Sequence, residues 1–365
     1  MPGEQKSLVF VGCGHAHALA LLKLRRTLPS NVKITVIEPN ERAVYSGMLP
    51  GFVAGHYSRD ELDIKIENLT DPLGARLITS RAKSLEPDRQ VVVLEDESEV
   101  YYDIASIDVG ITSAMPALPG FADWAVPAKP LAAFSDAWET CLESTESINI
   151  AVIGAGVAGA ELAMAMSFAR KENAKYGKVH LIDRGRALSV LRSKPRDLVK
   201  RALEGLDVEL HENCEITHLS KQGVHFSDET TLAANFVIGA AGATPHPFMS
   251  QTNLRSDDGF VVTNKFLQTS SEKIFATGDC AHFAPEPLPK AGVYAVRQAP
   301  ILAQNLVAAL NGAPFIAYEP QSDYLKLISL GGKSAVGEKF GFVMSGALVW
   351  QLKDKIDTGF MDRFK

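Results

Sequence analysis

The chain has 365 residues, of which 46% are hydrophobic and 22% charged, as expected for a globular protein with more than one domain. Its net charge of −6 lacks the basic excess typical of nucleic-acid binding, so we expect no nucleic-acid partner. The four cysteines form no CxxC or CxxxxC pair, which makes a cysteine metal knuckle unlikely and excludes a dithiol local in sequence. We expect no metal ligands, and free thiols in a cytoplasmic protein.

The first motif along the chain is a nucleotide-binding fingerprint. An apolar run at residues 8–11 predicts a strand, Gly12 and Gly14 follow it, and a helix is expected over residues 15–28. In such a unit the first glycine makes a tight turn and the second lets a pyrophosphate approach the backbone. An acid that closes the next strand accepts from a ribose hydroxyl, and Glu38 stands in that position.

Two histidines depart from the general motif. His17 stands where the fingerprint has its third glycine, the residue that permits close packing of helix on strand. The departure indicates looser packing or a histidine near the pyrophosphate, and a merely packed histidine is the alternative. His15 carries the same alternatives, and we count both among the candidate cofactor-binding residues.

The residues that follow predict a β-meander, a strand and a linker. Alternating apolar residues at 90–94 belong to the meander, and a buried strand at 102–109 leads into Gly110, Ile111 and Thr112. The segment 115–130 is rich in proline. Because proline interrupts both helices and β-ladders, we expect a linker there.

A second copy of the fingerprint opens at residue 148. The strand 148–153 leads into Gly154, Gly156 and Gly159, so all three motif positions are glycine, and Asp183 closes the next strand. One copy alone is a modest signal. Two copies in register predict two dinucleotides, and the economical pair is a flavin and a nicotinamide.

The acid of the second copy bears on the choice of nicotinamide. A carboxylate at Asp183 would repel the 2′-phosphate of NADPH and therefore favours NADH. Arg184 and Arg186 follow directly, and they could accept that phosphate instead, which keeps NADPH open.

Beyond the second fingerprint the pattern returns to the first domain. A meander around residues 208–226 and a strand at 236–240 complete the second unit, after which a short strand at 273–279 precedes a helix over 292–310. We predict an α/β protein of two Rossmann-like domains, one inserted into the other. The expected limits are 1–115 and 243–320 for the FAD-binding domain, 116–242 for the NAD(P)H-binding domain and 321–365 for a C-terminal cap with an amphipathic helix.

Together, the motifs resemble the two-dinucleotide-binding-domain flavoproteins of the pyridine nucleotide–disulfide oxidoreductase superfamily. Within it the chain is most similar to type II NADH:quinone dehydrogenases and to a branch whose members are sometimes fused to selenophosphate synthetase. The resemblance covers nearly the whole chain, and it is carried by residues 12–17, 45–51, 276–279 and 289–298 and by the tail from Trp350 to Phe364.

The resemblance implies FAD at the first fingerprint and NAD(P)H at the second. The carboxyl of Asp279, after Gly278, is implied to accept from the ribityl hydroxyls of FAD. A helix that begins at Gly292 and Val293 is expected to direct its positive end at the flavin pyrimidine edge, where it would stabilise anionic reduced flavin. Pro50 and Thr112 complete the implied cofactor-binding residues.

Two side chains are candidates for a catalytic role. In the resembled dehydrogenases a glutamate at the position of Glu161 approaches the nicotinamide and the flavin, and the alternative is favourable pairing with the helix dipole. Lys290 could add a positive charge near the flavin, or it could be a solvated loop lysine. Hydride transfer depends mainly on stacking and orientation, so we expect no catalytic triad.

The segment 45–51 lies where disulfide-reducing relatives place a CxxxxC pair beside the flavin, but it contains no cysteine. Electrons on the flavin therefore cannot pass to a vicinal dithiol, which argues against glutathione-, lipoamide- and thioredoxin-type reduction. Sulfide:quinone reductases also depend on flavin-proximal cysteines, and Cys141, Cys214 and Cys280 do not match their pattern.

We therefore predict an FAD-dependent NAD(P)H dehydrogenase that passes electrons to a quinone-like acceptor. The alternatives are an FAD-dependent reductase of a small molecule or a selenium/sulfur metabolite, and a redox-responsive binding flavoprotein with little turnover.

The C-terminal tail, residues 346–365, has apolar residues at near-helical spacing, opposed by a charged face. It could hold the protein peripherally on the inner face of a membrane, cover the flavin domain or form a homodimer contact. The expected apolar stripe comprises Leu348, Val349, Leu352, Ile356, Phe360 and Phe364, and the charged face comprises Lys353, Asp354, Lys355 and Asp357.

Overall fold

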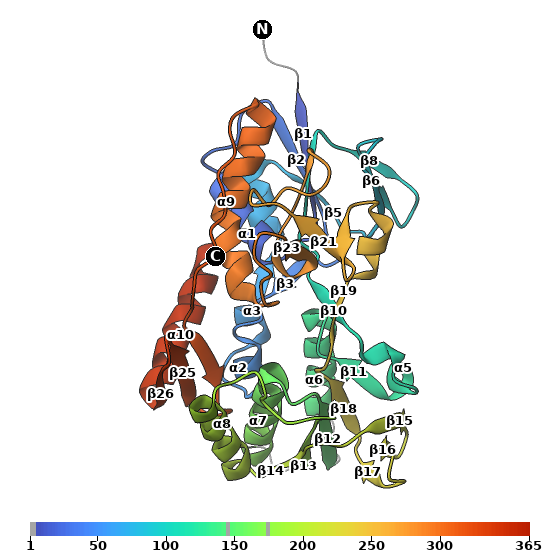
Figure 1. Ribbon diagram of the computed structural model, residues 1–365, viewed down its shortest axis with the longest axis vertical. Helices are drawn as coiled ribbons and strands as arrows, with labels where there is room; N and C mark the ends of the chain where they lie inside the picture. The colour runs from blue at the N-terminus through green and yellow to red at the C-terminus, as the bar shows by residue number, and fades with distance from the viewer. Residues whose placement is uncertain (1–4, 144–146, 173–175) are drawn as a thin grey trace.

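The computed structural model describes residues 5–143, 147–172 and 176–365, and it shows two lobes with a C-terminal element along one side (Figure 1). The first lobe is built on a parallel sheet of five strands in the order β22–β9–β1–β2–β5. The strands are β1 (Lys6–Val11), β2 (Val32–Ile37), β5 (Arg76–Ile78), β9 (Ile104–Ile107) and β22 (Ile274–Ala276).

Both faces of this sheet are covered, which is why β1 reads as a continuous apolar run. Helices α1 (His15–Leu24) and α9 (Gly292–Asn311) pack together on one face. On the other face lies the predicted meander of β6 (Ala82–Glu86), β7 (Val91–Leu94) and β8 (Glu99–Tyr101). The chain therefore returns to its first sheet through β22 and α9.

The second lobe repeats the design around a parallel sheet in the order β11–β18–β12–β13–β14. Helices α7 (Val157–Glu172) and α8 (Ser193–Gly205) lie on it, and a meander of β15 (Ile216–Ser220), β16 (Gly223–Phe226) and β17 (Thr231–Ala233) completes the unit. The sheet strands are β11 (Ala125–Pro127), β12 (Ile148–Ile153), β13 (Tyr176–Ile182), β14 (Val208–His211) and β18 (Phe236–Gly239).

Two sequence predictions in this lobe were wrong. The proline-rich segment is not a linker, because it forms η2 (Met115–Ala117), α5 (Phe121–Trp124) and the edge strand β11. An edge strand and a first helical turn tolerate the missing N–H of proline. The segment 208–211 is not part of the meander but the outermost parallel strand, β14.

The chain crosses between the lobes on two paired strands. It leaves the first lobe on β10 (Ile111–Ser113) and returns on β19 (Ala243–Pro245), and these two strands pair antiparallel with each other (Figure 1). The predicted domain limits at 115 and 242 lie beside this crossing, and they stay a prediction.

The C-terminal element contains a sheet that the sequence analysis does not predict. Strands β24 (Lys326–Ser329), β25 (Ala335–Lys339) and β26 (Phe342–Gly346) form an antiparallel sheet, and α10 (Ala347–Met361) follows directly. This element packs against α7 and α8 of the second lobe. None of the helices within the described residues is both long and apolar enough to cross a bilayer.

The remaining elements are short, apart from the 13-residue helix α6. They are β3 (Arg42–Val44), α2 (Leu49–Val53), α3 (Arg59–Leu62), β4 (Asp63–Lys65), α4 (Glu67–Thr70), η1 (Asp71–Leu73), α6 (Leu131–Glu143), η3 (Pro247–Gln251), β20 (Ser256–Asp257), β21 (Phe260–Thr263), η4 (Gly278–Cys280), β23 (Ala281–Phe283) and η5 (Asp362–Phe364).

Candidate functional site

The three glycines of the second fingerprint have three different surroundings. Gly154 has φ +106°, and a Cβ atom there would lie 2.8 Å from the Ala241 nitrogen, so only glycine makes this turn. A Cβ atom at Gly159 would lie 1.9 Å from the Gly154 oxygen, so this glycine allows α7 to pack on the turn. Gly156 is exposed, and a Cβ atom there would meet nothing within 4 Å. The second glycine thus leaves open the surface that a pyrophosphate needs.

The carboxyl of Asp183 is fixed beside this turn. Its Oδ2 accepts from the Ala155 N–H at 2.7 Å, and its Oδ1 accepts from the Gly185 N–H at 2.8 Å. Arg184 and Arg186 are exposed. The acid of the motif therefore stands at the nucleotide turn, where an adenine ribose is expected.

The first fingerprint repeats this arrangement. Oε2 of Glu38 accepts from the Cys13 N–H at 3.0 Å, in the same relation to its turn as Asp183. Gly12 has φ +82°, and a Cβ atom there would lie 2.5 Å from the Asp108 carbonyl oxygen. Both turns thus require glycine at their first position. In both, the N–H of the next residue donates to the carboxylate of the motif's acid.

His17, at the third motif position, is buried and fully engaged. Its Nδ1 lies 2.6 Å from the Gly12 oxygen, and its Nε2 lies 2.7 Å from the Ser106 hydroxyl. Burial lowers the pKa of His17 to about 4, so the ring is neutral at physiological pH. We therefore interpret His17 as a packed residue that braces the glycine turn against β9, which supports the packed alternative over contact with a pyrophosphate.

Asp108, directly after β9, is a site residue that the sequence analysis misses. Its Oδ2 accepts from the N–H groups of Ala16 and His17 at 3.0 and 3.1 Å, and its backbone oxygen accepts from Gly14 at 3.1 Å. Burial is the main cause that raises the pKa of Asp108 to about 7, and the nearby charges of Asp279 and Glu38 raise it further. A carboxyl that holds a proton near neutrality therefore caps the helix start.

Unsatisfied polar atoms beside this helix start indicate space for a ligand. Nε2 of His15 and Oγ1 of Thr277 are both shielded from solvent and have no hydrogen-bond partner. Such atoms are costly unless a bound group satisfies them. A Cβ atom at Gly278 would lie 2.5 Å from Asp108 Oδ1, and one at Gly292 would lie 3.8 Å from His15 Nδ1. The glycine turn, the Gly278 turn and the start of α9 therefore converge, and the residues present fit a dinucleotide.

The two charged candidates near α9 are each held by the protein. Asp279 accepts from the Lys129 ammonium at 3.2 Å. The Lys290 ammonium donates to the Ala281 oxygen at 2.7 Å and lies 3.8 Å from the centre of the Phe260 ring. Lys290 is thus not a freely solvated loop lysine, and its role toward a flavin stays a prediction.

Glu161 faces the C-terminal element. It is the fifth residue of α7, which has no acid in its first turn, so the alternative of dipole pairing loses support. Its Oε1 accepts from the Ser329 N–H of β24 at 2.7 Å. Burial raises the pKa of Glu161 to about 7, and the positive charge of Lys353 opposes this rise. Its predicted approach to nicotinamide and flavin remains a prediction.

Of the other predicted residues, Pro50 and Thr112 lie where the two lobes meet, and Val293 lies at the start of α9. Pro50 is buried in α2, and α2 packs against α7 of the second lobe. Thr112 lies on β10 opposite Thr244 of β19. Val293 is the second residue of α9. The cysteine-free segment 45–51 therefore lies between the first fingerprint and the helix of the second.

Helix α10 is hydrogen-bonded to residues 45–57 through three of its charged side chains. The Tyr45 hydroxyl donates to Asp357 at 3.0 Å, and the Tyr57 hydroxyl donates to Asp354 at 2.7 Å. The Lys353 ammonium donates to the Gly47 oxygen at 2.6 Å. Burial and the neighbouring carboxylates raise the pKa of both tyrosines.

The expected stripe of α10 is therefore wrong in part. Lys353, Asp354 and Asp357 face the protein, whereas Leu348, Leu352 and Ile356 are exposed. Val349, Phe360 and Phe364 of the stripe are buried, and Lys355 of the charged face is exposed. The buried side of this segment therefore combines apolar and charged residues, which the predicted division into two faces did not anticipate.

Comparison with known proteins now identifies the family. The family model described as pyridine nucleotide-disulphide oxidoreductase matches residues 6–299. The chain belongs to this family. Its members bind FAD and NAD(H), so the predicted superfamily, α/β fold and cofactor class are confirmed.

Individual relatives have low sequence identity to this chain, but their similarity extends over most of each chain. A NADH dehydrogenase-like protein of Bacillus subtilis is 23% identical, with 99% of each chain covered. A demethylphylloquinone reductase of Synechocystis is 24% identical over 86% of this chain and 81% of its own. The sulfide:quinone oxidoreductase structure of Aquifex aeolicus has a TM-score of 0.80 at 16% identity, with 98% of this chain and 91% of that chain covered, and it shows the shared fold alone.

Proposed function

We propose that this protein is an FAD-dependent NADH dehydrogenase that passes electrons to a quinone-like acceptor without a redox disulfide. The observation that carries the proposal is the position of the cysteine-free segment 45–51, which lies beside His15 of the first fingerprint and Gly292 of α9 and leads into α2, the helix that packs on α7. All four cysteines are free. The names of the relatives from Bacillus subtilis and Synechocystis support a dehydrogenase and a quinone acceptor, respectively.

The side chains of this protein bind and orient, and the cofactor supplies the redox chemistry. Bound FAD would supply the chemistry of hydride acceptance and onward electron transfer. The turn at Gly156 and the Asp183 carboxylate would hold the nicotinamide nucleotide, with NADH favoured by that negative charge. The start of α9 at Gly292 would place a positive helix end beside the flavin. NADPH remains open through Arg184 and Arg186.

The acceptor half of the proposal is supported by an exposed apolar surface. Phe342 is 82% exposed and Leu348 is 80% exposed, although such residues usually avoid water. A quinone dissolved in lipid would reach a protein that docks there on a membrane surface. We define the apolar surface by the residues Phe342, Met344, Leu348, Leu352 and Ile356, all on β26 and α10.

The test is reoxidation of the NADH-reduced protein by quinones. We expect a soluble quinone and a lipophilic quinone in vesicles both to reoxidise the flavin within the turnover time. The double variant Leu348→Glu, Leu352→Glu should slow vesicle reoxidation at least about tenfold by weakening membrane docking, and should leave the soluble quinone unaffected. Tyr101→Glu, on an exposed apolar residue of β8, is the matched control.

Other outcomes contradict the proposal in distinct ways. Reduction by NADH that no quinone reverses would favour a reductase of a small molecule or a selenium/sulfur metabolite. A long-lived charge-transfer complex with little turnover would favour a redox-responsive binding flavoprotein. Unchanged vesicle rates in the double variant would refute docking through the apolar surface.

The protonation of Asp108 predicts a pH-dependent affinity for FAD. The carboxyl is neutral below its pKa of about 7 and anionic above it, and an anion there would repel the FAD phosphates. Affinity should therefore fall as pH rises through 7, by up to about tenfold per pH unit. Asp108→Asn should abolish this dependence and bind FAD more tightly at alkaline pH. Fluorescence titration of the apoprotein with FAD at several pH values measures this affinity. If the affinity changes with pH in the same way in Asp108→Asn and in the unmodified protein, Asp108 does not have this role.

A further inference from the structure

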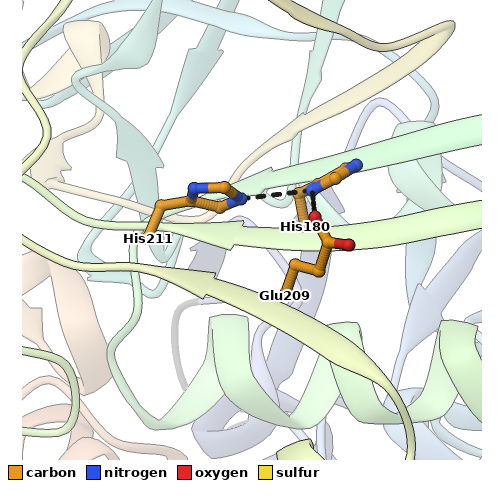
Figure 2. Close-up of side chains that lie close together, drawn as sticks. All are labelled: His180, Glu209 and His211. Atoms are coloured by element: carbon orange, nitrogen blue, oxygen red, sulfur yellow. Dashed lines mark hydrogen bonds and ion pairs between the residues drawn. The ribbon is translucent and has the colours of Figure 1, made fainter.

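Three metal-ligating side chains lie together at the edge of the second sheet, on strands β13 and β14. In the parallel register of β13 and β14, His180 stands directly opposite Glu209. His211 is two residues beyond Glu209, so it projects from the same face of β14. Figure 2 shows the three side chains pointing toward one another across the two strands. None of them has a role in the proposed electron transfer.

The separations of their ligand atoms match a tetrahedral metal site. His180 Nδ1 lies 3.2 Å from His211 Nε2 and 3.2 Å from Glu209 Oε2. All three atoms lie within 4.8 Å of one another. Zinc bonds of about 2.0–2.1 Å in a tetrahedron place neighbouring ligand atoms about 3.3 Å apart. Two edges of such a tetrahedron are therefore already formed.

Hydrogen bonding alone leaves this cluster poorly satisfied. Nδ1 of His180 carries at most one hydrogen, yet it faces both a ring nitrogen and a carboxylate oxygen. A single Nδ1 hydrogen must therefore be shared between His211 and Glu209, or, if Nδ1 accepts from His211, its lone pair lies beside the carboxylate oxygen. A cation between the three atoms would use all three lone pairs.

The surroundings are those of a usable metal site. Only 5% of the His180 side chain is exposed, whereas 39% of the Glu209 side chain is exposed, so water can reach one side. The Lys178 ammonium bonds Oε1 of Glu209, which orients the carboxylate and leaves Oε2 toward the histidines.

We infer that His180, Glu209 and His211 form a binding site for a divalent transition metal ion, with zinc the best match and water as the fourth ligand. Two imidazole nitrogens and one carboxylate oxygen are a ligand set that zinc accepts. The ion would tie the edge strand β14 to β13. Because the His211 oxygen accepts from the Asp183 N–H at 2.9 Å, it would also brace the strand end that carries the nucleotide-binding acid.

Zinc titration of the FAD-loaded, chelator-treated protein tests the inference. We expect calorimetry to show one zinc ion per chain and a higher melting temperature with zinc. His211→Ala should weaken zinc binding by roughly 100-fold. Because His180 is buried and its replacement could disturb folding, Glu209→Gln is the second variant, and it should also weaken binding.

The matched control uses another histidine pair of the same lobe. His218 and His225 stack at 4.1 Å on β15 and β16, so a His218→Ala, His225→Ala variant removes two histidines without touching the cluster. It should bind zinc as the unmodified protein does. Absence of stoichiometric binding would overturn the inference. So would unchanged affinity in His211→Ala and Glu209→Gln, or loss of binding in the control.

Discussion

Replacing Gly156 by valine is expected to abolish reduction of the flavin by NADH while FAD stays bound. A Cβ atom added at Gly156 meets nothing within 4 Å, so we expect the fold to tolerate the substitution. The valine side chain would occupy the surface where the pyrophosphate of NADH must approach. Misplacement of a bound reactant by about 1 Å lowers a reaction rate roughly 100-fold, so we expect flavin reduction by NADH to slow by at least about 100-fold. Stopped-flow measurement of flavin reduction by NADH gives the result.

A valine elsewhere in the same lobe controls for general effects. Gly205, the last residue of α8, also has nothing within 4 Å of an added Cβ atom. Gly205→Val should keep the reduction rate within about twofold and serves as the baseline for stability. Normal reduction by NADH in Gly156→Val would mean that the second fingerprint does not hold the nicotinamide nucleotide.

Replacing Gly12 by alanine should strongly weaken FAD binding. The residue has φ +82°, and the new Cβ atom would lie 2.5 Å from the Asp108 carbonyl oxygen and 2.9 Å from a Val109 side-chain carbon. Left-handed strain of about 1–3 kcal/mol adds to this clash, and the chain can relieve it by moving the turn away from Asp108. We expect the affinity for FAD to fall by about 10- to 100-fold, which is equivalent to about 1.4–2.8 kcal/mol of binding free energy. The protein should therefore purify largely without the yellow colour of bound flavin.

A substitution at a second glycine separates the effect of backbone strain from the effect of the clash with Asp108. Gly74 has φ +56° with nothing within 4 Å of an added Cβ atom, and it lies in the loop after η1. Gly74→Ala should destabilise folding modestly and leave FAD affinity unchanged. Equal FAD affinity in Gly12→Ala and the unmodified protein would contradict the assignment of the first fingerprint to FAD.

The nucleotide-binding architecture could be predicted because its local signals agree with its fold. Each glycine run follows a buried strand and opens a helix, and the backbone of Gly12 and Gly154 has the positive φ that the motif requires. The acids Glu38 and Asp183 were identified by their place at the end of the next strand, and both accept from the first N–H after the leading glycine. Chain order also predicted the return of β22 to the first sheet.

What the sequence did not reveal depends on contacts between distant segments. Asp108 ends a strand, but its role comes from α1, which lies more than 90 residues earlier in the chain. Helical spacing on α10 suggested an apolar and a charged face, but the contacts with Tyr45 and Tyr57 hold Asp357 and Asp354 against the protein. His180 and Glu209 meet through the register of β13 and β14, and no spacing motif signals such a pair.

Anaerobic titration of the FAD-loaded protein with NADH tests the central claim most directly. The claim is that flavin takes the electrons of NADH directly, with no dithiol beside it. It predicts complete loss of the visible absorbance of the oxidised flavin at one NADH per FAD, because the flavin alone stores two electrons. Uptake of two NADH per FAD would reveal a redox disulfide, and a flavin that stays oxidised would show that the two nucleotides do not meet; either result would contradict the account.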